Sequence, residues 1–247
     1  MKGAGTPASR IYFWIMVALG AATCGVAGYH LFTRTTAYQW LILAGLTIVT
    51  GSITIKLPGV DSKVSLSDTL ICINLVLFGP SAGAITAALD GISGSLRCKT
   101  SSRRFEFMVF NTAAMALSAC LGGLAFASLT GGPMYYREPV TPLGSLLPAL
   151  VLLALVYYFA NSSFVALIVA LERKLNVFRV WRGEYLFAIV SYFAAASVAG
   201  LLAQAQRSVT VLMVLGVLAA VAAIYVSLRS YANKAGRALQ SQETANR

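Results

Sequence analysis

Residues 64–96, VSLSDTLICINLVLFGPSAGAITAALDGISGSL, decide how the rest of the chain is interpreted. They form two apolar runs, 64–79 and 80–96, which are joined only by Phe78-Gly79-Pro80-Ser81. As a helix, each run is about 24 Å long at about 1.5 Å per residue, which is short for a hydrocarbon core of about 30 Å. We expect either two membrane crossings or one re-entrant hairpin, and both return the chain to the side it left.

Six further apolar runs surround this pair, at 11–32, 38–55, 107–129, 146–171, 185–205 and 209–226. The whole chain is 58% hydrophobic and 11% charged, which is far more apolar than a water-soluble domain. A bilayer accommodates such helices because a lipid-embedded helix is apolar on every face. We predict an all-α fold, a polytopic transmembrane helical bundle of about eight helices over residues 11–226, between a cytoplasmic N-terminus at 1–10 and a cytoplasmic tail at 227–247.

The basic residues predict the orientation of this bundle. The chain has 19 Lys and Arg against 8 Asp and Glu, and with the N-terminus inside, all the cations except Arg34, Arg137 and Arg207 fall on the cytoplasmic side. Such a bias favours both termini inside under the positive-inside rule. We therefore expect a multi-pass protein of a bacterial inner membrane. Because the cations lie in short strips between apolar runs, we expect anionic lipid at the cytoplasmic loops and no nucleic-acid partner.

One of these strips also has the pattern of an interfacial helix. Residues 172–184, ERKLNVFRVWRGE, mix Phe178 and Trp181 with Arg179 and Arg182. An amphipathic segment of this kind lies in the plane of the membrane surface, with its apolar face at the acyl boundary. We expect a loop anchored on anionic lipid, with a regulatory docking site as the alternative.

Two acidic residues lie within the short apolar runs, where a charge costs about 2.5–3.5 kcal/mol on insertion scales. Asp68 is near the cytoplasmic start of its run and close to Lys63, so hydration or capping is its simplest role. Asp90 lies deeper, beside the small-residue series Gly83, Ala87, Gly91 and Ser95, which allows close helix contact. Asp90 is expected to point into the bundle, either as a hydrogen-bond anchor or as part of a ligand or ion site.

Amide side chains at membrane depth extend this candidate ligand site. Asn74, Asn111 and Asn161 each lie in an apolar run, and such groups commonly join helices by hydrogen bonds. The alternative is that they line a polar pocket together with Asp90. The candidate ligand-binding residues are therefore Asp90, Asn111, Asn161, Asp68 and Asn74.

Motifs for catalysis and for cofactors are missing from the sequence. It has no Walker loop, GxSxG or HExxH, and His30 is its only histidine. The four cysteines show no CxxC spacing, so neither a zinc site nor a disulfide framework is indicated. We expect no enzymatic activity, no cofactor and no metal.

Several stretches resemble the polytopic N-terminal membrane region that precedes HD-GYP or GGDEF signalling domains in bacteria. They are Ile55-Lys-Leu-Pro-Gly59 leading into 65–83, Phe110-Asn111, the segment from Tyr158-Phe-Ala-Asn161 to Val180-Trp181-Arg182, and the basic, Tyr-rich Tyr225-Val-Ser-Leu-Arg-Ser-Tyr231. The resemblance covers most of residues 50–230. It implies a membrane input module whose catalytic output domain is not in this chain.

Three functions remain open at this level. The first is a sensory or signalling input module that transmits a state through residues 227–240 to a second copy or to a separate signalling partner. The second is a small-molecule transporter, or a substrate-binding membrane subunit of an importer, which better explains Asp90 and the amides. The third is a lipid-interacting protein without a ligand.

Overall fold

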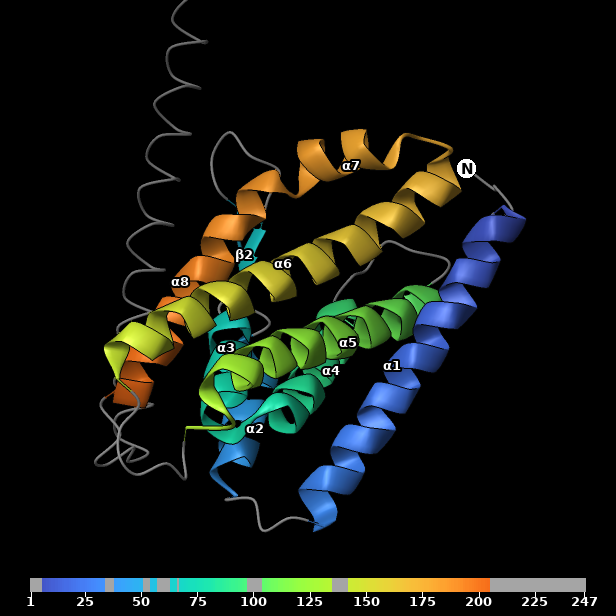
Figure 1. The fold of residues 1–247 in the computed structure, drawn as a ribbon. Helices are drawn as coiled ribbons and strands as arrows, with labels where there is room; N and C mark the ends of the chain where they lie inside the picture. The colour runs from blue at the N-terminus through green and yellow to red at the C-terminus, as the bar shows by residue number, and fades with distance from the viewer. Residues whose placement is uncertain are drawn as a thin grey trace, which may run out of the picture.

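The computed structural model describes residues 6–33, 38–50, 54–56, 63–65, 67–96, 104–134 and 142–204. It is an all-helical bundle, apart from two three-residue strands that pair antiparallel (Figure 1). The elements are α1 (Pro7–Thr33), α2 (Gln39–Thr50), β1 (Thr54–Lys56), β2 (Lys63–Ser65), α3 (Ser67–Phe78), α4 (Pro80–Leu96), α5 (Arg104–Thr130), α6 (Leu143–Arg173), α7 (Val177–Glu184), η1 (Leu186–Ala188) and α8 (Ile189–Gln204).

The predicted alternation of helix direction is found in the bundle. The start of α1 lies at the end of α6, where the Thr6 hydroxyl donates to the Leu171 carbonyl at 3.2 Å. The α4 and α5 helices run antiparallel, because Gly91 of α4 lies against Thr112 while Pro80 lies against Gly123. One end of the bundle holds the starts of α1 and α5, the end of α6 and all of α7, and we call it the basic end. We call the opposite end of the bundle the far end.

The basic end carries Arg10, Arg173, Lys174, Arg179 and Arg182. Arg34, Arg137 and Arg207, the three cations expected on the other face of the membrane, lie outside the described residues. The arrangement of the helix ends therefore agrees with the charge pattern. The assignment of the basic end to the cytoplasm stays a prediction.

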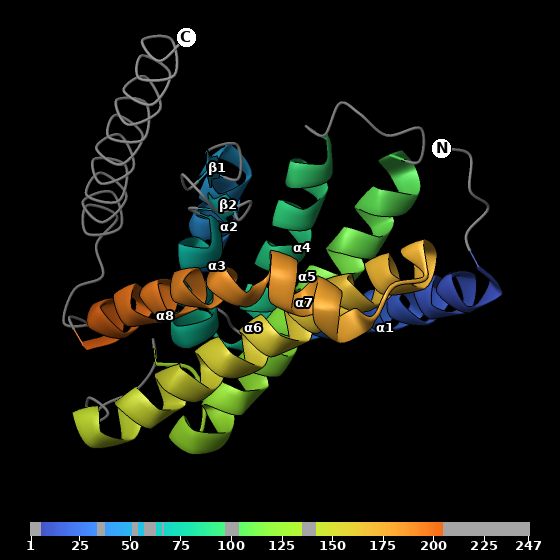
Figure 2. The same cartoon turned by 90° about the horizontal axis from the view of Figure 1, so that it is seen from above.

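The most buried helix is α3, which forms a hairpin with α4 and packs against α2, α5 and α8, while α4 packs against α1, α2 and α5 (Figure 2). Leu70 to Leu77 are almost fully buried, and the two helices are joined by Gly79 alone. Gly79 adopts a φ of +94°, a left-handed conformation that is open to glycine at little cost. This residue permits a reversal too sharp for most side chains.

The small-residue series on α4 makes the close contacts that its spacing predicts. A Cβ on Gly83 would overlap the Leu75 side chain of α3, and a Cβ on Gly91 would lie 2.8 Å from the Thr112 Cα of α5. Ala87 and Ser95 are fully buried in the same series. Backbone approach without side chains in between is how helices pack tightly in lipid.

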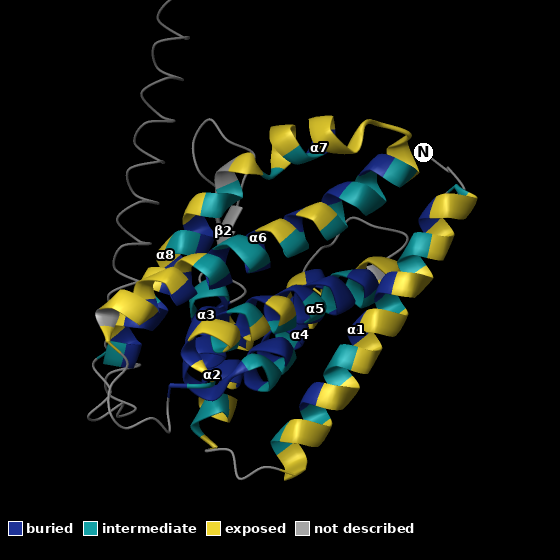
Figure 3. Cartoon of the chain, viewed as in Figure 1, coloured by how far each residue is buried: buried dark blue, intermediate teal, exposed yellow. Residues whose placement is uncertain are grey.

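The prediction of about eight crossings is corrected by helix length. Among the described residues, three helices are long and apolar enough to cross a membrane, α1, α5 and α6, and a fourth span results if the bent pair α7 and α8 counts as one. The α2 and α3 helices have 12 residues each, too few for a bilayer at about 1.5 Å per residue. Other helices cover the surface of α3, as Figure 3 shows, whereas α2 buries Leu43 and Ala44 and leaves Leu41 and Val49 exposed.

The helix found in the apolar run 38–55 is shorter than the run itself. The α2 helix ends at Thr50, and residues 54–56 form β1, which pairs with β2 in the register Ile55 to Val64. The β-branched residues Thr54, Ile55 and Val64 favour extended backbone. The last expected crossing, 209–226, and the tail at 227–247 lie outside the described residues.

The amphipathic helix expected within 172–184 is present as α7. The Asn176 side chain caps it by accepting from the amides of Phe178 and Arg179 at 2.9 and 3.3 Å. Asparagine is a favoured residue for this position, because its side-chain oxygen pairs amides that have no partner inside the helix. Val180 is buried against α6 and Phe178 is 64% exposed, so α7 packs part of its apolar face on the bundle and leaves the rest open.

Candidate functional site

The two predicted carboxylates lie together where α3 begins and α4 approaches its end. Asp90 is 9% exposed, and its Oδ2 accepts a hydrogen bond from the Ser67 hydroxyl at 2.9 Å. Asp68 is partly buried in the first turn of α3, where the helix dipole favours a negative charge. The carboxyl groups of Asp68 and Asp90 are close enough to interact electrostatically. The structure therefore brings together two of the five candidate residues.

Two buried tyrosines connect this acidic pair to α6 and α8. Tyr157 of α6 is fully buried, and its ring meets that of Tyr192 of α8 edge to face, with the ring centroids 4.8 Å apart. Both phenol groups lie within electrostatic range of Asp68. Tyr157 also interacts with Asp90, so the acidic pair and the aromatic pair belong to one region.

Asn161 joins the same region from the next turn of α6. Its side-chain nitrogen donates to the Tyr192 hydroxyl at 2.7 Å. We call Asp68, Asp90, Tyr157, Asn161 and Tyr192 the inner polar cluster. Among the described residues, the buried Tyr157 hydroxyl and the Asn161 side-chain oxygen have no hydrogen-bond partner, so the cluster has unused donor and acceptor capacity.

Asn74 is placed elsewhere and has a structural role in the described chain. Its side-chain nitrogen donates to the Thr86 hydroxyl at 2.7 Å and to the Trp40 carbonyl at 3.3 Å. Thr86 in turn donates to the Ala82 carbonyl of its own helix at 2.8 Å. Asn74 thereby joins α2, α3 and α4, as the alternative interpretation of these amides predicts.

Asn111 lies on the other side of α4. Its side-chain nitrogen is 3.5 Å from both the Gly91 carbonyl and the Ser95 hydroxyl, which are long contacts. It therefore bridges α5 to α4 at the level of the small-residue series. Asn111 and Asn74 do not share one pocket with the three predicted residues of the inner polar cluster.

The tyrosines are the members of the cluster that the sequence did not point to. Tyr157 and Tyr158 stand in the middle of an apolar run, where a phenol group at membrane depth is a signal for an internal partner. A second polar contact lies towards the basic end, where the Trp181 indole nitrogen donates to the Ser162 hydroxyl at 2.9 Å. This bond holds α7 against α6, and Tyr158 adds a bond to the Tyr185 carbonyl at 3.2 Å.

Two cavities border α1, and neither of them is lined by the inner polar cluster. One, at the far end, has a volume of about 690 Å³ and a mostly apolar wall from α1, the turn at Gly79 and Pro80, and α5. The other, at the basic end, has about 540 Å³ and lies between α1, α5 and α6.

Metal binding finds no support in the part of the chain that the structure describes, because no three His, Cys, Asp or Glu side chains gather there as a metal ion requires. Comparisons with protein-family models, with curated proteins and with solved structures find no match to this chain. The resemblance to membrane input regions of signalling proteins stays a hypothesis.

Proposed function

We propose that this chain is a membrane-embedded binding module for a small amine-bearing solute, with the inner polar cluster as its binding site, and that it serves as the input part of a signalling system. The proposal rests on one observation. Tyr157, a fully buried phenol within electrostatic range of two carboxyl groups, makes no hydrogen bond within the described residues. A buried polar atom without a partner costs about 1–3 kcal/mol, and a solute group that paired with the Tyr157 hydroxyl would recover this cost.

The chemistry of the cluster supports a solute that carries positive charge. Asp68 supplies a second carboxyl group beside Asp90, and the Asn161 oxygen is an available acceptor. Tyr157 can donate a hydrogen bond. A small polar solute with an ammonium group fits this site, because the ammonium can donate to the two acceptors and pair with a negative charge, and another polar group of the solute can accept from the donor.

The position of α8 supports a role in transmission. Tyr192 belongs to this helix, which is the last one before the predicted crossing at 209–226 and the tail at 227–240. A solute that separates Tyr192 from Asn161 or from Tyr157 would shift α8 against α6. The ligand shifts the equilibrium between two helix arrangements by the difference between its affinities for them.

A thermal-unfolding experiment on the detergent-purified chain tests the binding step. The panel contains amino acids and linear polyamines, and a bound solute raises the melting temperature by mass action. We expect at least one panel member to stabilise the chain and Tyr157→Phe to abolish that stabilisation. Tyr29→Phe, at an exposed tyrosine of α1, is the control and should keep it. No stabilisation by any member, or the same stabilisation in Tyr157→Phe, would overturn the proposal.

A carrier is the second candidate, and the α3–α4 hairpin favours it. Two short helices that reverse at Gly79 inside the bundle resemble the interrupted helices that hold substrate sites in transporters. Uptake of the stabilising solute into liposomes that contain the chain would decide for the carrier. For the input module we expect no uptake, and a fluorophore at Leu201 on the exposed face of α8 should change its emission when the solute is added.

A further inference from the structure

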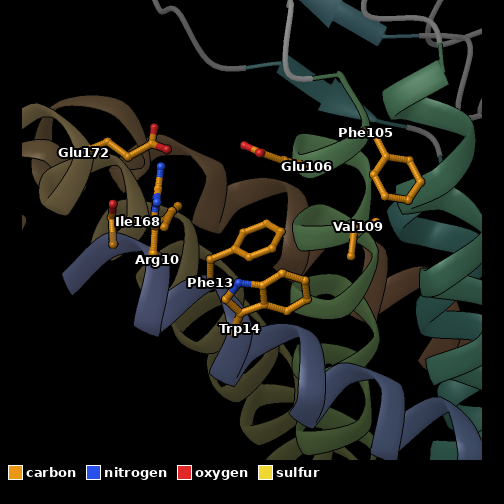
Figure 4. A pocket seen from close by; sticks show the side chains of 9 residues that line it. Arg10, Phe13, Trp14, Phe105, Glu106, Val109, Ile168 and Glu172 are labelled. Atoms are coloured by element: carbon orange, nitrogen blue, oxygen red, sulfur yellow. The ribbon is translucent and has the colours of Figure 1, made fainter. Parts of the chain in front are cut away.

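The α7 helix is strongly amphipathic, and its cations are open to their surroundings. Arg179 and Arg182 are exposed, and neither forms an ion pair with another residue of the described chain. Arg10, at the neighbouring cavity of the same end, points instead towards Glu172 (Figure 4). Cations at a membrane surface attract anionic headgroups. The exposed face of α7 is therefore a surface that fits an anionic membrane.

Phe178 adds an apolar group to this exposed face. Its ring is largely exposed and precedes Arg182 by four residues, which places both side chains on one face of the helix. An aromatic ring beside arginines is typical of a helix that lies in the headgroup layer with its apolar side chains at the acyl boundary. On another face, Val180 is buried with Ala166 and Ala170 of α6. The α7 helix thus contacts the bundle with one face and leaves the other open to lipid.

A series of aromatic rings leads from this surface to the inner polar cluster. The Phe178 ring stacks on Trp181 with the ring centroids 6.1 Å apart, and Trp181 meets Tyr158 of α6 at the same distance. Tyr158 is fully buried, and its ring centroid lies 5.7 Å from that of Tyr192. We call these four residues the aromatic ladder. One end of the ladder is an exposed ring at the basic end, and the other end is a member of the inner polar cluster.

Hydrogen bonds attach the middle of the ladder to α6. The Trp181 indole nitrogen donates to the Ser162 hydroxyl at 2.9 Å, and this hydroxyl donates to the Tyr158 carbonyl at 2.7 Å. The Tyr158 hydroxyl donates at 3.2 Å to the carbonyl of Tyr185, the residue that follows α7. A displacement of α7 therefore has to break these bonds or move the Tyr158 ring.

The backbone gives α7 a second connection to Tyr192. Only Tyr185 and the η1 turn separate α7 from α8, and Tyr192 is the fourth residue of α8. The Tyr185 amide donates to the Trp181 carbonyl, and the Ala188 amide donates to the Tyr185 carbonyl, both at 3.0 Å. Because this connection is short and hydrogen-bonded, a movement of α7 is passed to the first turn of α8.

We propose that α7 docks on an anionic membrane surface and that the docked helix, through the aromatic ladder, regulates solute binding at the inner polar cluster. The inference rests on the function proposed above. Docking fixes α7 and favours the closed arrangement seen here, in which Tyr192 accepts a hydrogen bond from Asn161 at 2.7 Å. A solute that has to separate these side chains then binds more weakly. Because coupling between two sites is reciprocal, the bound solute also weakens the docking of α7.

Fluorine NMR of the full chain in lipid nanodiscs tests both docking and its transmission. Fluorotyrosine replaces Tyr192, and the nanodiscs contain dioleoylphosphatidylcholine alone or with an equal part of dioleoylphosphatidylglycerol. We expect a different chemical shift in the two lipids, because this ring lies against Tyr157 and Tyr158. Arg182→Gln should reduce the difference. Arg10→Gln removes a cation from α1 at the same end and is the control that should keep the difference.

Trp181→Leu tests the ladder itself. The variant keeps Phe178 and both exposed arginines but removes the ring that contacts Tyr158, so the difference at Tyr192 should vanish. If the variant fails to fold, Phe178→Ala replaces it, because this ring is largely exposed and its loss spares the core. Phe178→Ala should reduce the difference. A parent-like difference in Phe178→Ala, or in a folded Trp181→Leu, would overturn the inference.

The solute affinity separates this inference from the function on which it rests. For the amino acid or polyamine that stabilises the chain most, we expect about fivefold weaker binding in the anionic nanodiscs. Equal affinity in both lipids would overturn the inference and leave the proposed function standing. The same Tyr192 signal in both lipids would also overturn it, and would leave the α7 surface to a protein partner. If no solute binds in either lipid, the proposed function fails, and with it the claim that α7 regulates solute binding.

Discussion

The α3–α4 hairpin and α1 have similar composition but opposite surroundings. Both are apolar throughout, yet α3 has nearly every side chain buried, whereas α1 buries only Ser9, Met16, Gly20 and Ala27. The hairpin is also short, and α1 has 27 residues. Hydropathy therefore detects that a segment avoids water, but it does not tell whether other helices or lipid cover it. Length, glycine spacing and internal polar groups make that distinction.

The polar groups of the two regions differ in the same way. Polar side chains of the hairpin reach other helices, as Asn74 reaches Thr86 and Ser67 reaches Asp90. Thr23 and Thr33 of α1 donate back to carbonyls of their own helix at 2.8 Å. A hydroxyl that satisfies itself within its own turn is suited to a lipid-facing helix, because lipid offers it no partner. Substitutions at matched positions test this contrast.

Gly91→Leu should produce the largest effect. A Cβ at this position would lie 2.8 Å from the Thr112 Cα, so a leucine must force α4 and α5 apart. Overpacking of this kind costs about 3 kcal/mol of the free energy of unfolding, measured by SDS titration in mixed micelles. Gly94→Leu, one turn away with nothing within 4 Å of its Cβ, should stay within about 0.5 kcal/mol of the parent. Equal losses at both positions would mean that the contact with Thr112 does not set the cost.

Thr86→Val should destabilise the chain by about 1–2 kcal/mol, because the buried Asn74 amide loses its 2.7 Å partner. Valine has nearly the shape of threonine, so the change isolates the hydroxyl. Thr23→Val on α1 makes the same chemical change at an exposed site and should cost less than about 0.5 kcal/mol. If the two variants unfold alike, the amide of Asn74 makes no measurable contribution.

The sequence was most informative about helix existence and direction. It predicted α4 with the bounds found, and it placed α1, α5 and α6 to within four residues at each end. The helices are longer than their apolar runs because polar residues such as Arg104 and Glu106 still satisfy backbone hydrogen bonds beyond the last apolar side chain. The charge pattern predicts the orientation with both termini inside, and this orientation stays a prediction.

The neighbours of each helix could not be predicted from the sequence. Tyr192 and Asn161 are 31 residues apart, and Thr6 and Leu171 are 165 apart, so no local pattern connects them. Asp68, Asp90 and Asn161 were correctly singled out as polar groups in apolar runs, but only the packing shows that Tyr157 and Tyr192 link them. The same packing assigns Asn74 and Asn111 to contacts between other helices.

Gly20→Leu tests how much the contact between α1 and α5 contributes to the free energy of unfolding. Gly20 is the glycine at which α1 touches α5 through Ala113, and a leucine there would overlap both the side chain and the backbone of that residue. Because most of α1 faces outward and the helix can tilt away, we expect a loss of about 1 kcal/mol, smaller than at Gly91. Gly25→Leu, with open space around its Cβ, is the control. A loss as large as that of Gly91→Leu would show that α1 belongs to the core.

Val26→Ala should have the smallest effect on the free energy of unfolding. Paired with Val76→Ala, it compares the surroundings of α1 and α3 directly. Val26 of α1 is 61% exposed, and Val76 of α3 is fully buried, so the same two carbon atoms are removed from opposite surroundings. Lipid surrounds the Val26 side chain in the folded and the unfolded chain, and its loss should change the free energy of unfolding by less than about 0.5 kcal/mol. Val76→Ala leaves a cavity in the hydrophobic core and should cost about 2 kcal/mol. A loss at Val26 that matched the loss at Val76 would mean that this face of α1 is covered by protein, either a second copy or another part of the chain.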